Sequence, residues 1–245
     1  LKAQKTVETL YSALSNTLGG DESTYIPATS MFILNDIESV SYFKDLAKQH
    51  SPLLKQVGYK KQLATENMRL QRADFAPQVA LTGMAAFYNY QVSPIIPKWA
   101  VGAGVSLKIF DGLNREYKFS AAKSQIRQVE AVGHQAESDI LTLIDKLYNE
   151  MVTYSQQLPS VNASGRFAEE YLRIKEEAFK EGAAPSSDVV DARLNLAKIR
   201  IERLQAAYYY DMMLARLLEA CGQSELFPDY GKRAAAMPIR YEHDF

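Results

Sequence analysis

Two short segments alternate between apolar and small or polar residues, and the rest of the chain follows a helical pattern. They are residues 78–90 and 98–110, each about as long as a tilted transmembrane β-strand. One face of the second segment carries Trp99, Val101, Ala103, Val105, Leu107 and Ile109. The other face carries Ala100, Gly102, Gly104, Ser106 and Lys108. This contrast is typical of a membrane barrel wall, so the pattern predicts a β-hairpin with lipid on the side of Trp99, Val101, Val105 and Leu107. The alternative is a hydrophobic hairpin that packs on a soluble core.

The remaining pattern predicts long helices that end at prolines and glycines. Residues 1–20 are predicted to be the tail of a helix, 21–35 a connector and 223–245 an irregular tail. Two helices are predicted within 36–75, a short one to about His50 and a second that follows Ser51 and Pro52. Further helices are predicted at 113–158, 161–181 and 187–221, with Pro159 and Gly165 at a break. Residues spaced by four and three positions form a coiled-coil seam: Ala122, Ile126, Val129, Gly133, Ala136, Ile140, Leu143 and Leu147. The sequence therefore predicts a mainly α fold of long, antiparallel, coiled-coil-like helices with one β-hairpin.

Composition narrows the classes of function. The chain has 28 basic and 29 acidic residues, so its charge gives no reason to expect a nucleic-acid partner. Its one cysteine, Cys221, cannot form an internal disulfide. The three histidines are dispersed, and no nucleophile elbow, phosphate loop or zinc pattern occurs. We therefore expect no enzyme activity, no cofactor and no metal site.

The beginning of the chain resembles its end. Five residue pairs match at one offset: Leu1 with Leu204, Ala3 with Ala206, Leu14 with Leu217, Gly19 with Gly222, and Glu22 with Glu225. Any two helix ends share some leucine, alanine and glycine, so chance similarity stays open. If the repeat is real, residues 1–20 end a first repeat and residues 36–222 form a second one. Leu1 lies inside the pattern of a helix without a cap, so we expect the chain to be a fragment.

Four stretches between residues 51 and 222 resemble, in order, the TolC-like outer-membrane efflux family. They are Ser51–Leu54 at a helix start, Ala73–Gly83 at a helix-to-strand passage, Trp99–Gly112 at a strand and corner, and Gly182–Ala192 at a helical turn. The resemblance implies a trimeric duct, with a β-barrel in the outer membrane of a Gram-negative bacterium and a helical tunnel in the periplasm. The hairpin would then contribute to this outer-membrane β-barrel. The family's first hairpin and first long helices have no counterpart in this chain.

Asp188 and Asp191 are the candidate gate residues. They lie three positions apart, so they share one side of a helix. The resemblance implies that they ring the periplasmic entrance as a pore constriction, where carboxylates favour cations. The family often has an arginine near this gate, and Ala184 stands at that place. The alternative is that both acids only complement the dipole at the helix N-terminus.

Gly182, Ala183 and Ala184 form the predicted tip of the last helical hairpin. The resemblance implies that an adaptor helix contacts this tip, where small residues allow close approach. The alternative is an ordinary turn whose glycine serves the left-handed backbone.

The function that this sequence predicts best is a duct component of a tripartite efflux or type I secretion system. Its implied partners are a periplasmic adaptor, an inner-membrane pump, outer-membrane lipid and two further copies of the chain. Because such ducts leave most selection to the pump, the sequence identifies neither the substrate nor the pump. The alternative is a soluble coiled-coil scaffold or adaptor without transport activity.

Overall fold

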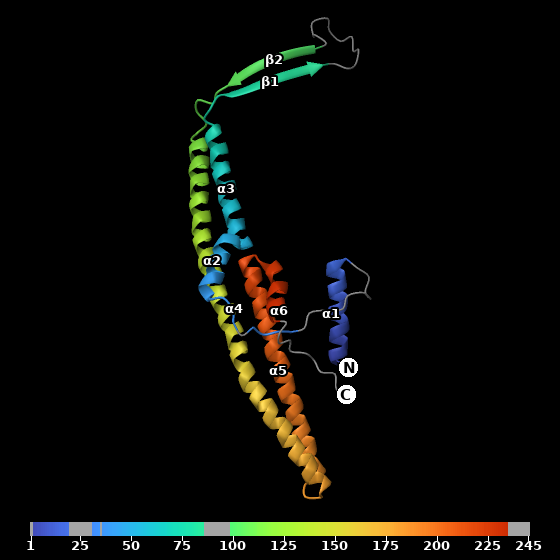
Figure 1. Ribbon diagram of the computed structural model, residues 1–245. Helices are drawn as coiled ribbons and strands as arrows, with labels where there is room; N and C mark the ends of the chain where they lie inside the picture. The colour runs from blue at the N-terminus through green and yellow to red at the C-terminus, as the bar shows by residue number, and fades with distance from the viewer. Residues whose placement is uncertain (1, 20–30, 35, 86–98, 235–245) are drawn as a thin grey trace. The chain divides into compact units, whose positions relative to one another are not determined.

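The computed structural model describes residues 2–19, 31–34, 36–85 and 99–234. Six helices, a short 3-10 turn and two strands occur in these ranges (Figure 1). They are α1 (Lys2–Leu18), α2 (Val40–His50), α3 (Pro52–Ala73), β1 (Gln78–Ala85), β2 (Trp99–Ser106), α4 (Asn114–Lys180), α5 (Ser186–Cys221), η1 (Ser224–Leu226) and α6 (Phe227–Ala234). The predicted fold class, mainly α with one antiparallel hairpin, is confirmed. Within the described ranges, every helix is too short or too polar to cross a lipid bilayer.

The chain divides into two compact units, which are described one at a time. The first unit comprises residues 1–37, 147–216 and 224–245, and the second comprises residues 38–146 and 217–223. α4 and α5 each contribute one part to each unit.

In the second unit, α3 runs antiparallel to the beginning of α4 (Figure 1). Lys61 pairs with Glu130 at 2.9 Å, whereas Asn67, farther along α3, bonds to the earlier residue Gln125. A Cβ atom on Gly133 would lie 3.3 Å from Val57, so glycine lets the two helices approach closely. The predicted antiparallel packing of these helices is therefore confirmed.

The end of α5 closes the core of the second unit. Cys221 is fully buried, and its thiol donates a hydrogen bond to the carbonyl oxygen of Phe43 at 3.3 Å. Gly222 adopts φ +71, and a Cβ there would lie 2.4 Å from the carbonyl oxygen of His50. Glycine is required at this helix end both for the left-handed backbone and for space.

In the first unit, α5 runs antiparallel to the second part of α4 (Figure 1). Tyr154 stacks on Tyr209 with ring centroids 5.2 Å apart, and Gly165 lies near Ile199. The strap at residues 31–34 completes the core, because Phe32 packs on Phe227 at 5.5 Å. The buried residues of this unit include Phe32, Ile33, Leu34, Met151, Ala168, Ala192, Leu196, Ala207, Tyr210, Leu214 and Tyr230.

The structure corrects the predicted break at Pro159. α4 is one helix of 67 residues that continues through Pro159, so it is about 100 Å long at the usual rise per residue. Proline removes one backbone hydrogen bond and crowds the preceding turn. Contacts with α5 lie on both sides of this residue, at Tyr154 and at Gly165. α5 therefore supports the helix across the weak point.

Further boundaries differ from the expected ones. The first helix after the connector begins at Val40 rather than at residue 36. The tail predicted to be irregular contains η1 and α6. Pro228 does not prevent this helix, since it is the second residue of α6 and proline is tolerated in a first turn. β2 ends at Ser106, so residues 107–110 leave the ladder that was predicted to continue to 110. Residues 20–30, 35, 86–98 and 235–245, which include most of the predicted connector and parts of both predicted strands, lie outside the described residues.

Candidate functional site

The turn between α4 and α5 carries the tip predicted from the sequence. Gly182 has φ +73, and no atom lies within 4 Å of where its Cβ would be, so its glycine serves the backbone conformation rather than close packing. The Ala183 N–H donates to the carbonyl oxygen of Ala178 at 2.8 Å, which closes the end of α4. Gly182 and Ala183 are exposed, and Ala184 is half-buried. The tip therefore presents a small, open surface.

The two candidate gate residues have different surroundings in the structure. The Asp188 carboxylate forms an ion pair with Lys175 of α4 at 2.7 Å, and the two side chains are 34% and 26% exposed. The hydrogen bond to Asp188 raises the pKa of Lys175 above its ordinary value. Asp191 is exposed and has no hydrogen-bond or ion-pair partner among the described residues. Of the two aspartates, Asp191 is therefore the one whose carboxylate has no cationic partner among the described residues.

Sequence reasoning missed Lys175, although the chain carries a signal for it. Residues at equal distances from the turn of an antiparallel helical hairpin face each other, and Lys175 and Asp188 stand about equally far from the tip. The same geometry joins Arg193 to Glu176 at 2.7 Å and Arg200 to Glu169 at 3.5 Å. Exposed ion pairs contribute about 0–1 kcal/mol each. These pairs therefore specify which residues of α4 and α5 face each other more than they stabilise the fold.

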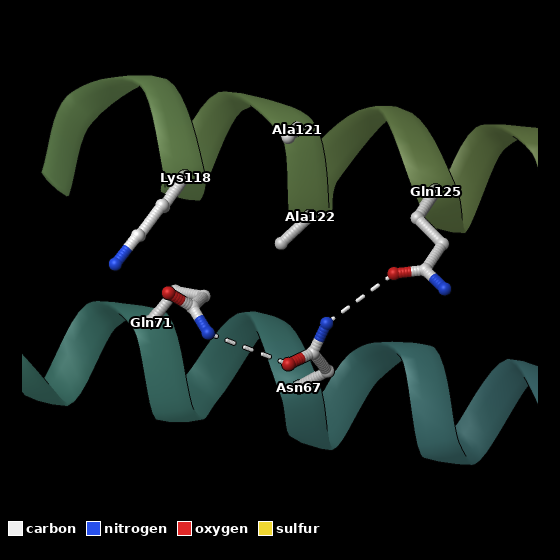
Figure 2. A pocket seen from close by; sticks show the side chains of 6 residues that line it. All are labelled: Asn67, Gln71, Lys118, Ala121, Ala122 and Gln125. Atoms are coloured by element: carbon white, nitrogen blue, oxygen red, sulfur yellow. Dashed lines mark hydrogen bonds between the residues drawn. The ribbon is translucent and has the colours of Figure 1, made fainter. Parts of the chain in front are cut away.

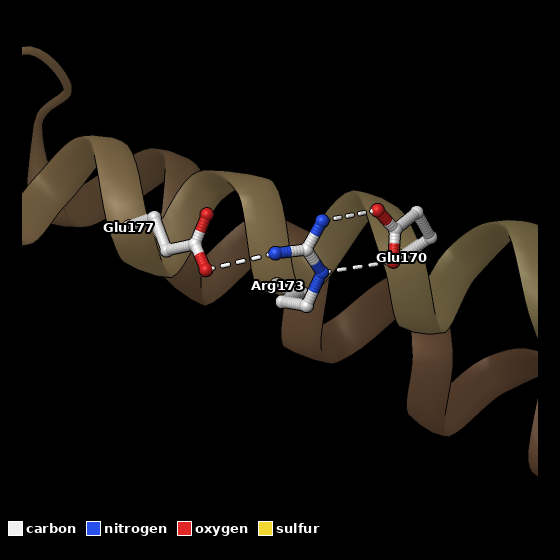
Figure 3. Close-up of polar contacts among 3 residues, drawn as sticks. All are labelled: Glu170, Arg173 and Glu177. Carbon is white, nitrogen blue, oxygen red and sulfur yellow. Dashed lines mark hydrogen bonds and ion pairs between the residues drawn. The ribbon is translucent and has the colours of Figure 1, made fainter.

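One arginine network lies along α4 itself. Figure 3 shows Arg173 between Glu170 and Glu177, and its Nη1 atom donates to Glu177 at 2.8 Å. The hydrogen bonds with Glu170 raise the pKa of Arg173 and lower that of Glu170. All three side chains are more than half exposed, so water screens their attraction. The network is a charged patch on the helix surface near the tip.

The hairpin presents an apolar face that nothing in the described chain covers. β1 and β2 pair antiparallel, with Val79 opposite Val105, Gly83 opposite Val101 and Ala85 opposite Trp99. Four apolar side chains of this face are 71–81% exposed: Val79, Leu81, Trp99 and Val101. Val105 is 71% exposed as well.

The opposite face of the hairpin carries mainly small and polar residues, with Met84 as a large apolar exception that is 54% exposed. Gln78 pairs with Ser106 there, and Thr82 pairs with Gly102. The predicted separation of the two faces is therefore present in the ladder. Leu107, which was predicted to lie on the apolar face, follows the last residue of β2 and is 54% exposed.

A groove lies between α3 and α4 in the second unit (Figure 2). Its volume is about 330 Å³, and its lining residues are Asn67, Gln71, Lys118, Ala121, Ala122 and Gln125. The amides bond to one another: Asn67 Nδ2 donates to Gln125 at 3.2 Å, and Gln71 Nε2 donates to Asn67 at 3.5 Å. Lys118 is the one titratable side chain in this lining, which has no carboxylate or histidine to pair with it, so the groove offers no acid–base pair for catalysis. Among the described residues, no group of three or more histidine, cysteine or acidic side chains could hold a metal ion.

Comparisons with known proteins identify the same family that the sequence resembles. Residues 44–223 match the family described as outer membrane efflux protein. This is a family of channels rather than enzymes, located in the outer membrane and periplasm of Gram-negative bacteria. A search of curated protein sequences found no match.

Several solved structures share the fold. The open-state outer membrane channel MtrE of Neisseria gonorrhoeae has a TM-score of 0.74 and 18% identity, over 91% of this chain and 52% of that one. VceC, an outer membrane protein of Vibrio cholerae, has a TM-score of 0.67 and 18% identity, over 89% and 53%. The CmeC outer membrane channel of Campylobacter jejuni has a TM-score of 0.64 and 19% identity, over 84% and 46%. The chain thus spans about half the length of these structures. Because the family match covers well over half of its residues, the chain belongs to the outer membrane efflux protein family, the TolC-like family that its sequence resembles.

Proposed function

We propose that this chain is a duct component through which substrates pass passively across the periplasm and outer membrane. One observation carries the proposal: the paired long helices lead into a hairpin whose apolar face is exposed, with Leu81 81% and Val101 76% accessible. An apolar face of this size is unfavourable in water and favourable against lipid. The small, polar face of the same hairpin suits a water-filled interior.

Membership of this family supports an inference about the partners of the duct. Channels of the family form trimers and work with a periplasmic adaptor and an inner-membrane pump. We infer the same assembly for this chain, in which the exposed tip at Gly182, Ala183 and Ala184 contacts the adaptor. Its small side chains let a partner helix approach the backbone. We infer that the duct catalyses no bond change, because its family is one of channels rather than enzymes.

Asp188 and Asp191 are proposed as the constriction of this duct. In a trimer, three copies of the exposed Asp191 around one axis would attract cations. Asp188 would contribute less free charge, because Lys175 pairs with it. The family often has an arginine near this gate, where this chain has Ala184. Lys175 would therefore be the cation near the constriction.

Two arginine substitutions on neighbouring residues test the duct against a soluble scaffold. The wild-type protein should fractionate with the outer membrane and need detergent for extraction. Val105→Arg should reduce membrane assembly, because an arginine facing lipid costs about 2–4 kcal/mol near the middle of a bilayer. Ser106→Arg, on the opposite face, is the matched control and should assemble normally. A wild-type protein that stays in the aqueous fraction, or equal assembly of both variants, would favour the scaffold.

A further inference from the structure

A buried arginine lies where the hairpin joins the helices in the second unit. The chain enters the hairpin after α3 and leaves it before α4, and Arg115 is the second residue of α4. Its side chain is only 11% exposed, although a guanidinium group stays charged in proteins. A buried charge is costly unless its surroundings satisfy it, so its contacts indicate what it does there.

Arg115 contacts both ends of the hairpin. Its Nη1 atom donates a long hydrogen bond, 3.5 Å, to the carbonyl oxygen of Asp74, just before β1. Its Nη2 atom donates a similar bond, 3.4 Å, to the carbonyl oxygen of Ile109, just after β2. Its Cζ atom lies 5.2 Å from the ring centroid of Phe75. Its Nε atom lies 3.2 Å from Asp111 Oδ2 as an ion pair, without a hydrogen bond to any described residue. One side chain therefore joins the segment that enters the hairpin to the segment that leaves it.

The backbone between β2 and α4 is strained. Gly112 and Leu113, which precede α4, have φ +72 and φ +67. A leucine in the left-handed region is strained, because its Cβ crowds the following carbonyl. The Asp111 side chain is 19% exposed, and its Oδ1 atom is buried without a hydrogen bond to any described residue. A strained turn and an incompletely satisfied carboxylate are both held beside the same guanidinium.

Only a guanidinium suits this arrangement. Its plane can lie against the Phe75 ring while its nitrogens point to acceptors in different directions. A lysine ammonium is a single point on a flexible stem and cannot reach both carbonyl oxygens while facing the ring.

We propose that Arg115 is a positioning residue that fixes the direction in which the β-hairpin leaves α3 and α4. It does so by tying the backbone at Asp74 to the backbone at Ile109 beside the start of α4. The inference concerns the geometry of the hairpin and does not depend on the proposed transport function.

Distances between spin labels on the whole chain test the proposal. One pair, at Leu81→Cys and Lys123→Cys, reports the direction of the hairpin relative to α4. A second pair, at Lys60→Cys and Lys123→Cys, reports the packing of α3 on α4. Cys221 is fully buried and should not take the label. Electron–electron double resonance in detergent is measured for the parent and for Arg115→Met, Arg115→Lys and Arg127→Met. Arg127 is a matched control on the same helix, bonded only to Ser124 at 3.0 Å in the described chain.

The parent and Arg127→Met should each give one narrow distance for the hairpin pair. Arg115→Met and Arg115→Lys should lose that distance, while the helix pair stays narrow in every variant. A hairpin distance that survives in either Arg115 variant, or that is broad in the parent, would overturn the proposal. Equal broadening of the helix pair would also overturn it, because Arg115 would then support the helices in general rather than position the hairpin.

Discussion

At the scale of single residues, Asp211 shows what happens to a carboxylate that is largely removed from water and has no ion-pair partner among the described residues. Its Oδ2 atom accepts a hydrogen bond from the Phe32 N–H at 3.2 Å, and its Oδ1 atom is buried without a hydrogen bond to any described residue. Burial raises the pKa of Asp211 to about 7, and the Phe32 N–H opposes this shift only in part. The folded protein therefore holds a proton on Asp211 at pH values where the unfolded chain has lost it.

This pKa predicts the direction of one pH dependence. Between the ordinary aspartate value of 3.8 and about 7, the folded state binds more protons at Asp211 than the unfolded state does. The contribution of this group to the free energy of unfolding should therefore fall as the pH rises through that window. Asp211→Asn keeps an acceptor for Phe32 and removes the titration. The free energy of unfolding of this variant, measured with denaturant, should depend less on pH than that of the parent between about pH 5 and pH 8. The upper limit lies about one unit above the raised pKa. An unchanged pH dependence in the variant would show that Asp211 is not the titrating group.

The gate residues give a second prediction at this scale. Asp188→Asn combined with Asp191→Asn should reduce cation selectivity and weaken block by multivalent cations in planar-bilayer recordings of the trimer. The cost in stability should be below about 1 kcal/mol for each residue: Asp188 is a first-turn charge in a half-exposed ion pair, and Asp191 is exposed and lies beyond the first turn of α5. Glu202→Gln, an exposed acid farther along α5, is the control. If the double variant conducts and is blocked like the parent but is less stable, the two acids serve the helix dipole and the Lys175 pair alone.

At the scale of elements, the hairpin and the helices were predictable because their signals are local and periodic. The alternation from Trp99 to Val105 gives the same two faces as the observed ladder. The predicted coiled-coil seam includes Gly133, and in the structure this residue lies where α3 and α4 approach closely. Both signals reflect which side of an element is buried or exposed, and that is decided along a few turns or a few residues.

The elements that could not be predicted depend on contacts far apart in the sequence. A proline is locally a break, and only the packing of α5 on either side explains why α4 continues through Pro159. The Lys175–Asp188 pair and the Arg115 contacts likewise join residues whose proximity depends on the turn between two elements. Gly19 and Gly222 both have φ +71, so the two helix ends matched in the sequence share a left-handed glycine, while the repeat itself stays a prediction.

At the scale of the whole molecule, the first unit leaves apolar seams uncovered on both of its long helices. On α5, Val190, Leu194 and Ile201 are 54–64% exposed. A helix turns by about 100° per residue, so this seam lies on the side of α5 opposite the buried Ala192 and Leu196. On α4, the exposed residues Phe167, Tyr171 and Ile174 follow the same helical spacing.

A helix with two opposite apolar stripes needs a neighbour on each side. In the first unit, α4 covers one stripe of α5, and the other stays open in the single chain. Further helices of the assembled duct are the proposed cover, because a trimer places other copies beside each helical pair. Polar residues such as Asn195 and Glu202 lie on a third side of α5, where such a neighbour would not bury them.

This arrangement predicts a specific defect in assembly. Leu194→Glu combined with Ile201→Glu should lower the fraction of trimer, because burying each apolar side chain contributes about 1.5–3 kcal/mol and burying a carboxylate opposes association. Asn195→Glu adds the same type of charge on the polar side of α5 and should assemble as the parent does. Light scattering coupled to size-exclusion chromatography in detergent measures the oligomer, and circular dichroism shows whether the helices still form. Loss of helix content in the double variant would assign the seam to folding of the single chain. Normal trimers with an intact fold would show that the seam of α5 is not a contact between copies.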